Sequence, residues 1–115
     1  MPSVIVKLAK HEVLTPAQRR SLGPELQRIV AEVLSVPGTQ AELWANEVEV
    51  DYVVAGPDAR MNGRDMVITV EANQYPERTG RAQEFSDSIK KSLKGTIIFP
   101  TRWNVWVRLA EGGWS

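Results

Sequence analysis

Hydrophobic residues follow two different spacings in the first half of the chain. Ser3 to Leu8 is a short run rich in β-branched residues, which is typical of a strand. Apolar residues then recur at intervals of three and four, which predicts the buried face of a helix. They are Leu22, Leu26, Ile29, Val30, Val33 and Leu34. Thr15 suits the N-cap of this helix and Pro16 its first turn. The Pro-Gly pair at 37–38 predicts the helix end, and a second strand is expected from about Ala41 to Val50.

The same order of elements is expected again in the second half. Met66 to Ala72 is a β-branched run that predicts a strand, followed by a polar loop. Thr79 is the expected N-cap of a second helix, which ends at 94–95. Its apolar face comprises Ala82, Phe85, Ile89 and Leu93. Asn104 to Leu109 predicts a final strand. Gly56 to Asp65, rich in Gly, Pro, Asp and Asn, predicts the loop between the halves.

The two halves therefore predict a fold with internal repetition. A strand–helix–strand unit almost always has a right-handed crossover, which makes its two strands parallel. Two such units side by side predict an α+β fold, a tandem β-α-β repeat in one four-stranded sheet with both helices on one face. The chain is expected to be a single domain, residues 1–115, with halves at about 1–58 and 64–115. Aligning Thr15 with Thr79 also aligns Pro2 with Met66.

Two features of this fold stay open at the level of sequence. The second face of the sheet has no helix over it, so its apolar positions predict either a hydrated face or burial by self-association. The same order of elements also occurs in ferredoxin-like domains that have no repeat history.

Composition narrows the functional classes. The 14 Lys and Arg residues balance 14 Asp and Glu residues, so no basic excess favours nucleic acid as a partner. The sequence has no cysteine and only one histidine, His11, in a polar loop, which disfavours thiol chemistry and a multi-histidine metal centre. No segment approaches the ~20 apolar residues of a membrane span, and no signal peptide is evident. A soluble, cytoplasmic protein without a membrane partner is the expectation.

Pro2 is the candidate for chemistry. It follows Met1 and precedes the first strand, and a small second residue such as proline normally permits removal of Met1. The freed secondary amine would titrate near neutrality, since an α-amino group has a reference pKa of ~7.7–8.0. Held at the start of a strand, it would be a well-placed proton carrier. The alternative is an ordinary Met-Pro start with no chemical role.

The whole chain resembles the tautomerase superfamily, which includes 4-oxalocrotonate tautomerase and macrophage migration inhibitory factor. The resemblance rests on the start MPSVIVKL, on Arg78-Thr79 at the second helix start, and on two strand ends with an acid followed by an aromatic. Those ends are Glu49 to Tyr52 and Glu111 to Trp114. Fused members of this length form homotrimers with the sheets packed inward, and they need neither cofactor nor metal. The resemblance thus implies a homotrimer that covers the second sheet face.

The resemblance also implies roles for individual residues. Pro2 would transfer the proton and Arg78 would bind the substrate carboxylate, since a guanidinium matches a carboxylate bidentately. Tyr52 and Trp114 occupy the place of the aromatic residue that closes the pocket, with core or trimer-interface packing as the alternative.

The family pattern is incomplete in this sequence. Trp44 and Trp106 stand where the family places a second arginine, which replaces a carboxylate clamp with aromatic walls. Arg81 is a possible substitute for it. Glu111 is a candidate for activating water or orienting the substrate, with a solvated strand-end acid as the alternative.

Three functions are compatible with these residues. The first is a proline-based tautomerase or isomerase of a small 2-oxo or 2-hydroxy unsaturated carboxylic acid. The second is a dehalogenase, hydratase or decarboxylase on the same fold, with a residue such as Glu111 activating water. The third is a non-catalytic trimeric interaction protein.

Overall fold

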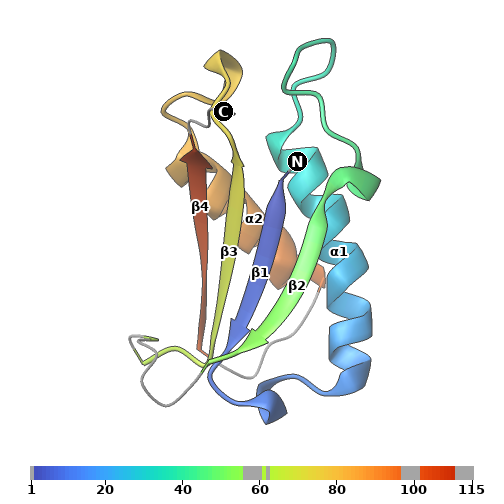
Figure 1. Ribbon diagram of the computed structural model, residues 1–115, viewed down its shortest axis with the longest axis vertical. Helices are drawn as coiled ribbons and strands as arrows, with labels where there is room; N and C mark the ends of the chain where they lie inside the picture. The colour runs from blue at the N-terminus through green and yellow to red at the C-terminus, as the bar shows by residue number, and fades with distance from the viewer. Residues whose placement is uncertain (1, 56–60, 62, 97–101, 111–115) are drawn as a thin grey trace, which may run out of the picture.

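The computed structural model describes residues 2–55, 61, 63–96 and 102–110 (Figure 1). Two long helices and four strands make up the described fold, together with three short 3-10 helices. In chain order they are β1 (Ser3–Leu8), η1 (His11–Val13), α1 (Pro16–Leu34), η2 (Ala45–Glu47), β2 (Glu49–Val54), β3 (Met66–Asn73), η3 (Pro76–Arg78), α2 (Ala82–Thr96) and β4 (Trp103–Ala110).

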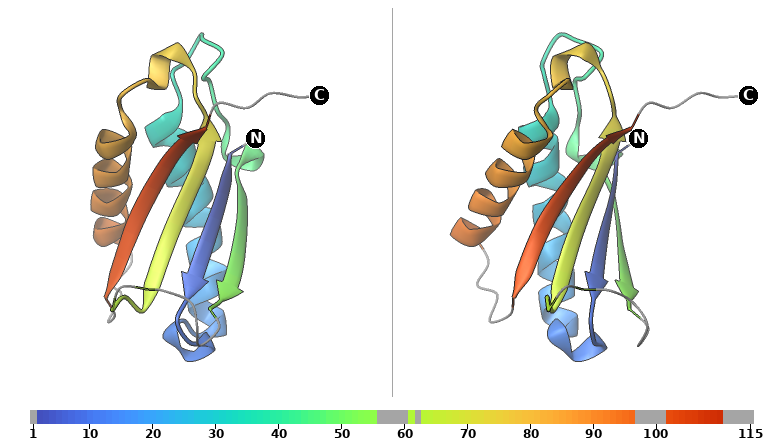
Figure 2. Two further views of the ribbon diagram at one scale, coloured as in Figure 1. Left: turned by 60° about the vertical axis from the view of Figure 1, so that its left-hand side comes forward. Right: turned by 90° about the vertical axis from the view of Figure 1, so that its left-hand side faces the viewer.

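The four strands form one mixed sheet in the order β2-β1-β3-β4. β1 is parallel to β2 and β3 is parallel to β4, while the two halves meet through the antiparallel pair β1 and β3. Both helices lie on the same face of the sheet (Figure 2). The predicted α+β architecture, with a parallel strand pair in each half, is therefore confirmed.

The core lies between the sheet and the helices. Alternate residues of the two central strands face the helices and are fully buried, among them Val4, Val6, Ile68 and Val70. The predicted helical stripes meet them from the other side, because residues three and four apart share one helix face. The buried stripe residues are Leu22, Leu26, Ile29, Val30, Leu34, Phe85, Ile89 and Leu93. The apolar pattern of the sequence thus accounts for the layered fold.

The start of α1 agrees with the sequence in detail. The Thr15 hydroxyl accepts a hydrogen bond from the Gln18 amide at 3.1 Å, and the Gln18 side chain accepts one from the Thr15 amide at 2.7 Å. This reciprocal capping box satisfies two backbone donors that a helix start otherwise leaves unpaired. Pro16 occupies the first helical position, as expected.

The expected strand from Ala41 to Val50 is wrong over most of its length. β2 begins only at Glu49, and the preceding residues form a turn and the 3-10 helix η2. The reason is local hydrogen bonding, because the Glu47 carboxylate accepts from the Trp44 amide at 3.0 Å and the Val48 amide donates to the Ala45 carbonyl. These bonds close a tight turn in place of a sheet ladder.

The expected N-cap of the second helix is also wrong. Thr79 lies at the end of η3, and its hydroxyl donates to the Tyr75 carbonyl at 3.2 Å. Gly80 follows with a φ of 75°, a left-handed conformation that glycine adopts without the penalty a side chain carries. The chain reverses there, so α2 begins at Ala82.

The second face of the sheet has no described element over it. Strand register aligns Ile5 of β1 with Thr69 of β3, and Thr69 in turn with Trp106 of β4. On this face Ile5 is 40% exposed, Val53 44% and Trp106 64%. No described helix is both long and apolar enough to cross a membrane.

Candidate functional site

Pro2 is held rigidly at one end of the sheet. It is buried and directly precedes β1, which has β2 on one side and β3 on the other. Its carbonyl accepts a hydrogen bond from the Glu49 amide at 3.2 Å. This bond joins the start of β1 to the start of β2. The pyrrolidine ring is therefore buried at the end of the sheet.

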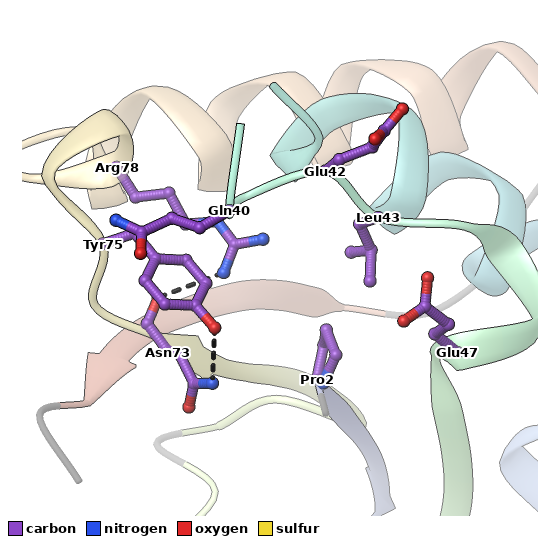
Figure 3. A pocket seen from close by; sticks show the side chains of 8 residues that line it. All are labelled: Pro2, Gln40, Glu42, Leu43, Glu47, Asn73, Tyr75 and Arg78. Carbon is purple, nitrogen blue, oxygen red and sulfur yellow. Dashed lines mark hydrogen bonds between the residues drawn. The ribbon is translucent and has the colours of Figure 1, made fainter. Parts of the chain in front are cut away.

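A small cavity of about 120 Å³ surrounds this ring. It lies where β1 begins and β3 ends, and its walls come from three parts of the chain: the N-terminus, the segment between α1 and β2, and the segment between β3 and α2. The described lining residues are Pro2, Gln40, Glu42, Leu43, Glu47, Asn73, Tyr75 and Arg78 (Figure 3). Both halves of the chain therefore contribute to one pocket.

Arg78 is the buried cation of this pocket. It is 2% exposed, and its guanidinium donates to three backbone carbonyls: Leu34 at 3.3 Å, Asn73 at 3.1 Å and Ala41 at 3.2 Å. Burial lowers the pKa of Arg78 from its usual very high value. Arginine nevertheless stays protonated in proteins, so a positive charge is enclosed here. The guanidinium has five N–H groups, and the three carbonyls account for three of them.

Tyr75 and Asn73 form the wall next to Arg78. The Arg78 guanidinium carbon lies 5.2 Å from the centre of the Tyr75 ring, a cation–π arrangement. The Asn73 side-chain amide donates to the Tyr75 hydroxyl at 3.2 Å. In Figure 3 Arg78, Tyr75 and Asn73 lie together on one side of Pro2, and the guanidinium faces the open space beside Pro2. This wall therefore combines a positive charge with polar hydrogen-bonding groups.

The opposite side of Pro2 is acidic and apolar. Glu47 is half-buried, and its carboxylate also accepts the Trp44 amide, which fixes its position. Figure 3 shows Leu43 and Glu47 across the ring of Pro2 from Tyr75, while the carboxylate of Glu42 points away from Pro2. The pocket thus places a proline between a guanidinium wall and a carboxylate wall.

The sequence-derived site residues have different locations. Pro2 and Arg78 line the same pocket. Tyr52 is half-buried on the helix side of β2, and its hydroxyl donates to the Arg19 carbonyl at 2.8 Å. Burial raises the pKa of Tyr52 above its ordinary value, while the positive charge of Arg19 acts in the opposite direction.

The other named residues lie elsewhere. Arg81 pairs with Glu84 at 2.6 Å and lies over the Phe85 ring, and Trp106 is exposed on the second sheet face. Neither they nor Tyr52 belong to the described lining of the Pro2 pocket. Glu111 and Trp114 lie outside the described residues.

Sequence reasoning missed the acidic wall. Leu43 and Glu47 are four residues apart, so the strand expected from Ala41 to Val50 would have placed both side chains on the same face of the sheet. The available signal is the spacing of Trp44 and Glu47, because an acid three residues after a turn start is typical of a capping box. Among the described residues, no group of three or more His, Asp or Glu side chains is arranged to hold a metal ion.

Solved structures supply a comparison for the fold. The chain is similar to the macrophage migration inhibitory factor-like protein of Entamoeba histolytica, with a TM-score of 0.58 and 16% identity over 96% of this chain and 88% of that one. It is also similar to a macrophage migration inhibitory factor homologue from Prochlorococcus marinus, with a TM-score of 0.56 and 18% identity over 98% and 95% of the two chains.

A fused 4-oxalocrotonate tautomerase described as an asymmetric trimer matches with a TM-score of 0.54 and 13% identity, over 95% of this chain and 86% of that chain. This chain has the tautomerase fold. No family model matches the sequence, and no curated protein matches it. At these identities the tautomerase fold itself is what the chain shares with its structural neighbours.

Proposed function

We propose that this protein is a cofactor-independent tautomerase acting on a small 2-oxo or 2-hydroxy unsaturated carboxylic acid. The observation that carries the proposal is that Pro2 and Arg78, from opposite halves of the chain, line one pocket. The similarity of the fold to macrophage migration inhibitory factor homologues and to a fused 4-oxalocrotonate tautomerase supports it.

The reaction is a proton transfer within the substrate. After removal of Met1, the neutral Pro2 amine takes the proton of the 2-hydroxyl group, and the resulting ammonium returns a proton to a carbon of the conjugated chain. No atom is gained or lost. A base whose pKa lies near the working pH is effective in both directions, and the α-amino group meets this condition.

Arg78 is proposed to hold the substrate carboxylate. Three of its five N–H groups are used by backbone carbonyls, which leaves one N–H on each terminal nitrogen for a ligand. The carbonyl bonds also fix the plane of the guanidinium, so binding costs little side-chain entropy. The enclosed charge favours an anion on this side of Pro2.

The test compares three forms of the protein with phenylenolpyruvate as substrate. The first has a free Pro2 amine, verified by intact mass. The second keeps Gly-Ser before Pro2, which leaves the ring unchanged but turns its nitrogen into an amide. The third is Pro2→Ala, which retains an amine without the ring. Loss of the basic nitrogen is expected to lower kcat/KM by at least about 100-fold. Equal rates for the first two forms would refute the proposal.

Hydration or hydrolytic dehalogenation is the second candidate function. It is favoured by one observation, the fixed and half-buried Glu47 carboxylate on the wall across Pro2 from Tyr75. In this reaction the protonated Pro2 would donate to one substrate carbon while a carboxylate takes a proton from the water that attacks the next carbon. With 3-chloroacrylate the resulting chlorohydrin then loses chloride and a proton and becomes an aldehyde. Turnover of propiolate or 3-chloroacrylate that is lost in Glu47→Gln would support this function, and full retention would exclude Glu47 from it. Glu111→Gln tests the sequence-derived candidate in the same assay.

We also propose that the protein is a homotrimer assembled through its second sheet face. The exposed Ile5, Val53 and Trp106 are the apolar groups that such an interface would cover. The fused 4-oxalocrotonate tautomerase is described as a trimer, and it shares this fold. Light scattering should give three times the chain mass, and Ile5→Glu should yield a monomer. Lys91→Glu, on the exposed side of α2, is the matched charge control. A native monomer would overturn the proposal.

A further inference from the structure

The Pro2 pocket has opposite charge on its two walls. Arg78 supplies a buried positive charge, with the Tyr75 ring beneath it and the Asn73 amide alongside. The Glu47 carboxylate lies on the far side of Pro2 (Figure 3). A ligand beside Pro2 therefore has a cation at one end and an anion at the other.

The acidic wall is held in place by a hydrogen bond, and neither of its described side chains, Leu43 and Glu47, can donate to a second anion. One carboxylate oxygen of Glu47 accepts the Trp44 amide at 3.0 Å, which holds the side chain in place. Its neighbour in the wall is Leu43, an apolar side chain that is 7% exposed. An ionised carboxylate accepts hydrogen bonds but donates none. A neutral polar group fits against this wall, whereas a carboxylate is repelled.

The surroundings of the pocket add to this polarity. Gln40 lines the pocket and donates to the Glu77 carboxylate at 3.5 Å, and Glu42 is exposed at the rim. Of the carboxylates at the pocket, that of Glu47 is the one that lies across Pro2 from Tyr75, while Glu42 points away from Pro2. The cavity volume of about 120 Å³ also leaves little room for a second charged group to remain hydrated.

We infer that this pocket selects substrates with one carboxylate and rejects dicarboxylates, with Glu47 as the residue that sets the selectivity. The inference rests on the proposed function, because it assigns the substrate class of the same site. The single carboxylate lies toward Arg78 and Tyr75, and the neutral end, such as an ester or a hydroxyl group, lies toward Glu47. Two like charges within a pocket of this size repel each other strongly enough to alter affinity by about tenfold.

Two matched pairs of compounds test the inference. Calorimetry compares the binding of monomethyl fumarate and fumarate, which differ by one charge. This binding measurement does not depend on turnover. Ketonisation assays compare 2-hydroxymuconate 6-methyl ester with 2-hydroxymuconate. The monoanion of each pair is expected to be preferred by about tenfold, in Kd and in kcat/KM. Higher salt should narrow the preference, because it screens the repulsion.

Substitution of Glu47 assigns the preference to one residue. Glu47→Gln keeps an oxygen that can accept the Trp44 amide and removes the charge, so the preference should fall toward unity. Glu12→Gln removes a carboxylate in η1, at the opposite end of the sheet, and should leave the preference unchanged. Equal or tighter binding of fumarate to the native protein overturns the inference, and so does an undiminished preference in Glu47→Gln. A monoanion preference without any ketonisation leaves the inference standing and refutes the proposed function.

Discussion

Replacing Arg78 with methionine tests whether one guanidinium joins the two halves of the chain. Its three carbonyl partners belong to separate segments: Leu34 ends α1, Ala41 lies between α1 and β2, and Asn73 ends β3. Methionine has a similar length and is apolar, so it can fill much of the space while leaving all three carbonyls without this donor. The variant therefore isolates the hydrogen bonds from the packing.

The expected loss of stability follows from those bonds. A hydrogen bond to a charged group contributes about 1.5–3 kcal/mol. The distances of 3.1–3.3 Å exceed the ~2.7–2.9 Å typical of charge-assisted bonds, which indicates the lower end of that range. The methionine also avoids the cost of burying a charge, which offsets part of the sum. We expect Arg78→Met to lower the free energy of unfolding by about 3 kcal/mol, a large fraction of the ~5–15 kcal/mol typical of a domain.

Urea denaturation followed by tryptophan fluorescence measures this loss at a fixed protein concentration. Arg81→Met is the control, because Arg81 is a partly exposed arginine of the same segment whose ion pair with Glu84 is at the surface. Its cost should stay below about 1 kcal/mol. An Arg78→Met protein within about 1 kcal/mol of the native one would show that the carbonyl bonds do not hold the halves together. A cost for Arg81→Met equal to that of Arg78→Met would be equally contrary to the argument.

Other substitutions test the local structure, each by urea denaturation. Thr15→Ala removes the capping box of α1 and should cost about 1 kcal/mol, whereas Thr79→Ala should cost less than about 0.5 kcal/mol; the reverse order would restore Thr79 as a helix cap. Gly80→Ala should cost about 1 kcal/mol through its φ of 75° alone, since a Cβ there meets nothing within 4 Å, and an unchanged midpoint would contradict this. Tyr52→Phe should cost about 1 kcal/mol at pH 7 through the lost bond to the Arg19 carbonyl. Burial raises the folded-state pKa of Tyr52 above the unfolded value of ~10. The neutral Tyr52 hydroxyl therefore makes its full contribution to the free energy of unfolding below pH ~10, and this contribution is lost as the pH rises through the folded pKa. The native protein should therefore lose more stability than Tyr52→Phe between pH 9 and 11, and parallel curves would refute the role of Tyr52.

The strands and helices were predictable wherever burial decides the structure. β1 spans Ser3 to Leu8, as the sequence pattern predicts, because alternate residues such as Val4 and Val6 must face the helices. The buried apolar face of α1 agrees with its prediction for the same reason. The start of this helix could be predicted from Thr15 and Pro16. In these segments the hydrophobic period and the local capping signals favour the same structure.

The segment from Ala41 to Val48 was not predictable in this way. Buried Ala41, Leu43 and Val48 suggest a strand when only burial is considered. The competing hydrogen bond from the Trp44 amide to Glu47 depends on a single side chain, and the spacing of hydrophobic residues does not indicate it. The acidic wall of the pocket was missed with the same segment. Pro2 and Arg78 could be named from the sequence, but the carbonyl partners of Arg78 come from residues up to 44 positions away, which no local pattern specifies.

The strand–helix–strand order of the two halves shows why the proposed site lies at one end of the sheet. Since β1 and β3 are antiparallel, equivalent loops of the two halves lie at opposite ends. Arg78 then corresponds to Leu14, which is 1% exposed and belongs to the hydrophobic core. Pro2 corresponds to Met66, whose amide nitrogen donates to the Arg102 carbonyl at 3.2 Å and has no basic lone pair. At one end of the sheet these positions therefore belong to the hydrophobic core. At the other end Pro2 and the buried guanidinium of Arg78 line one pocket, so within the described part of the chain the proposed base and the proposed carboxylate-binding group lie together there.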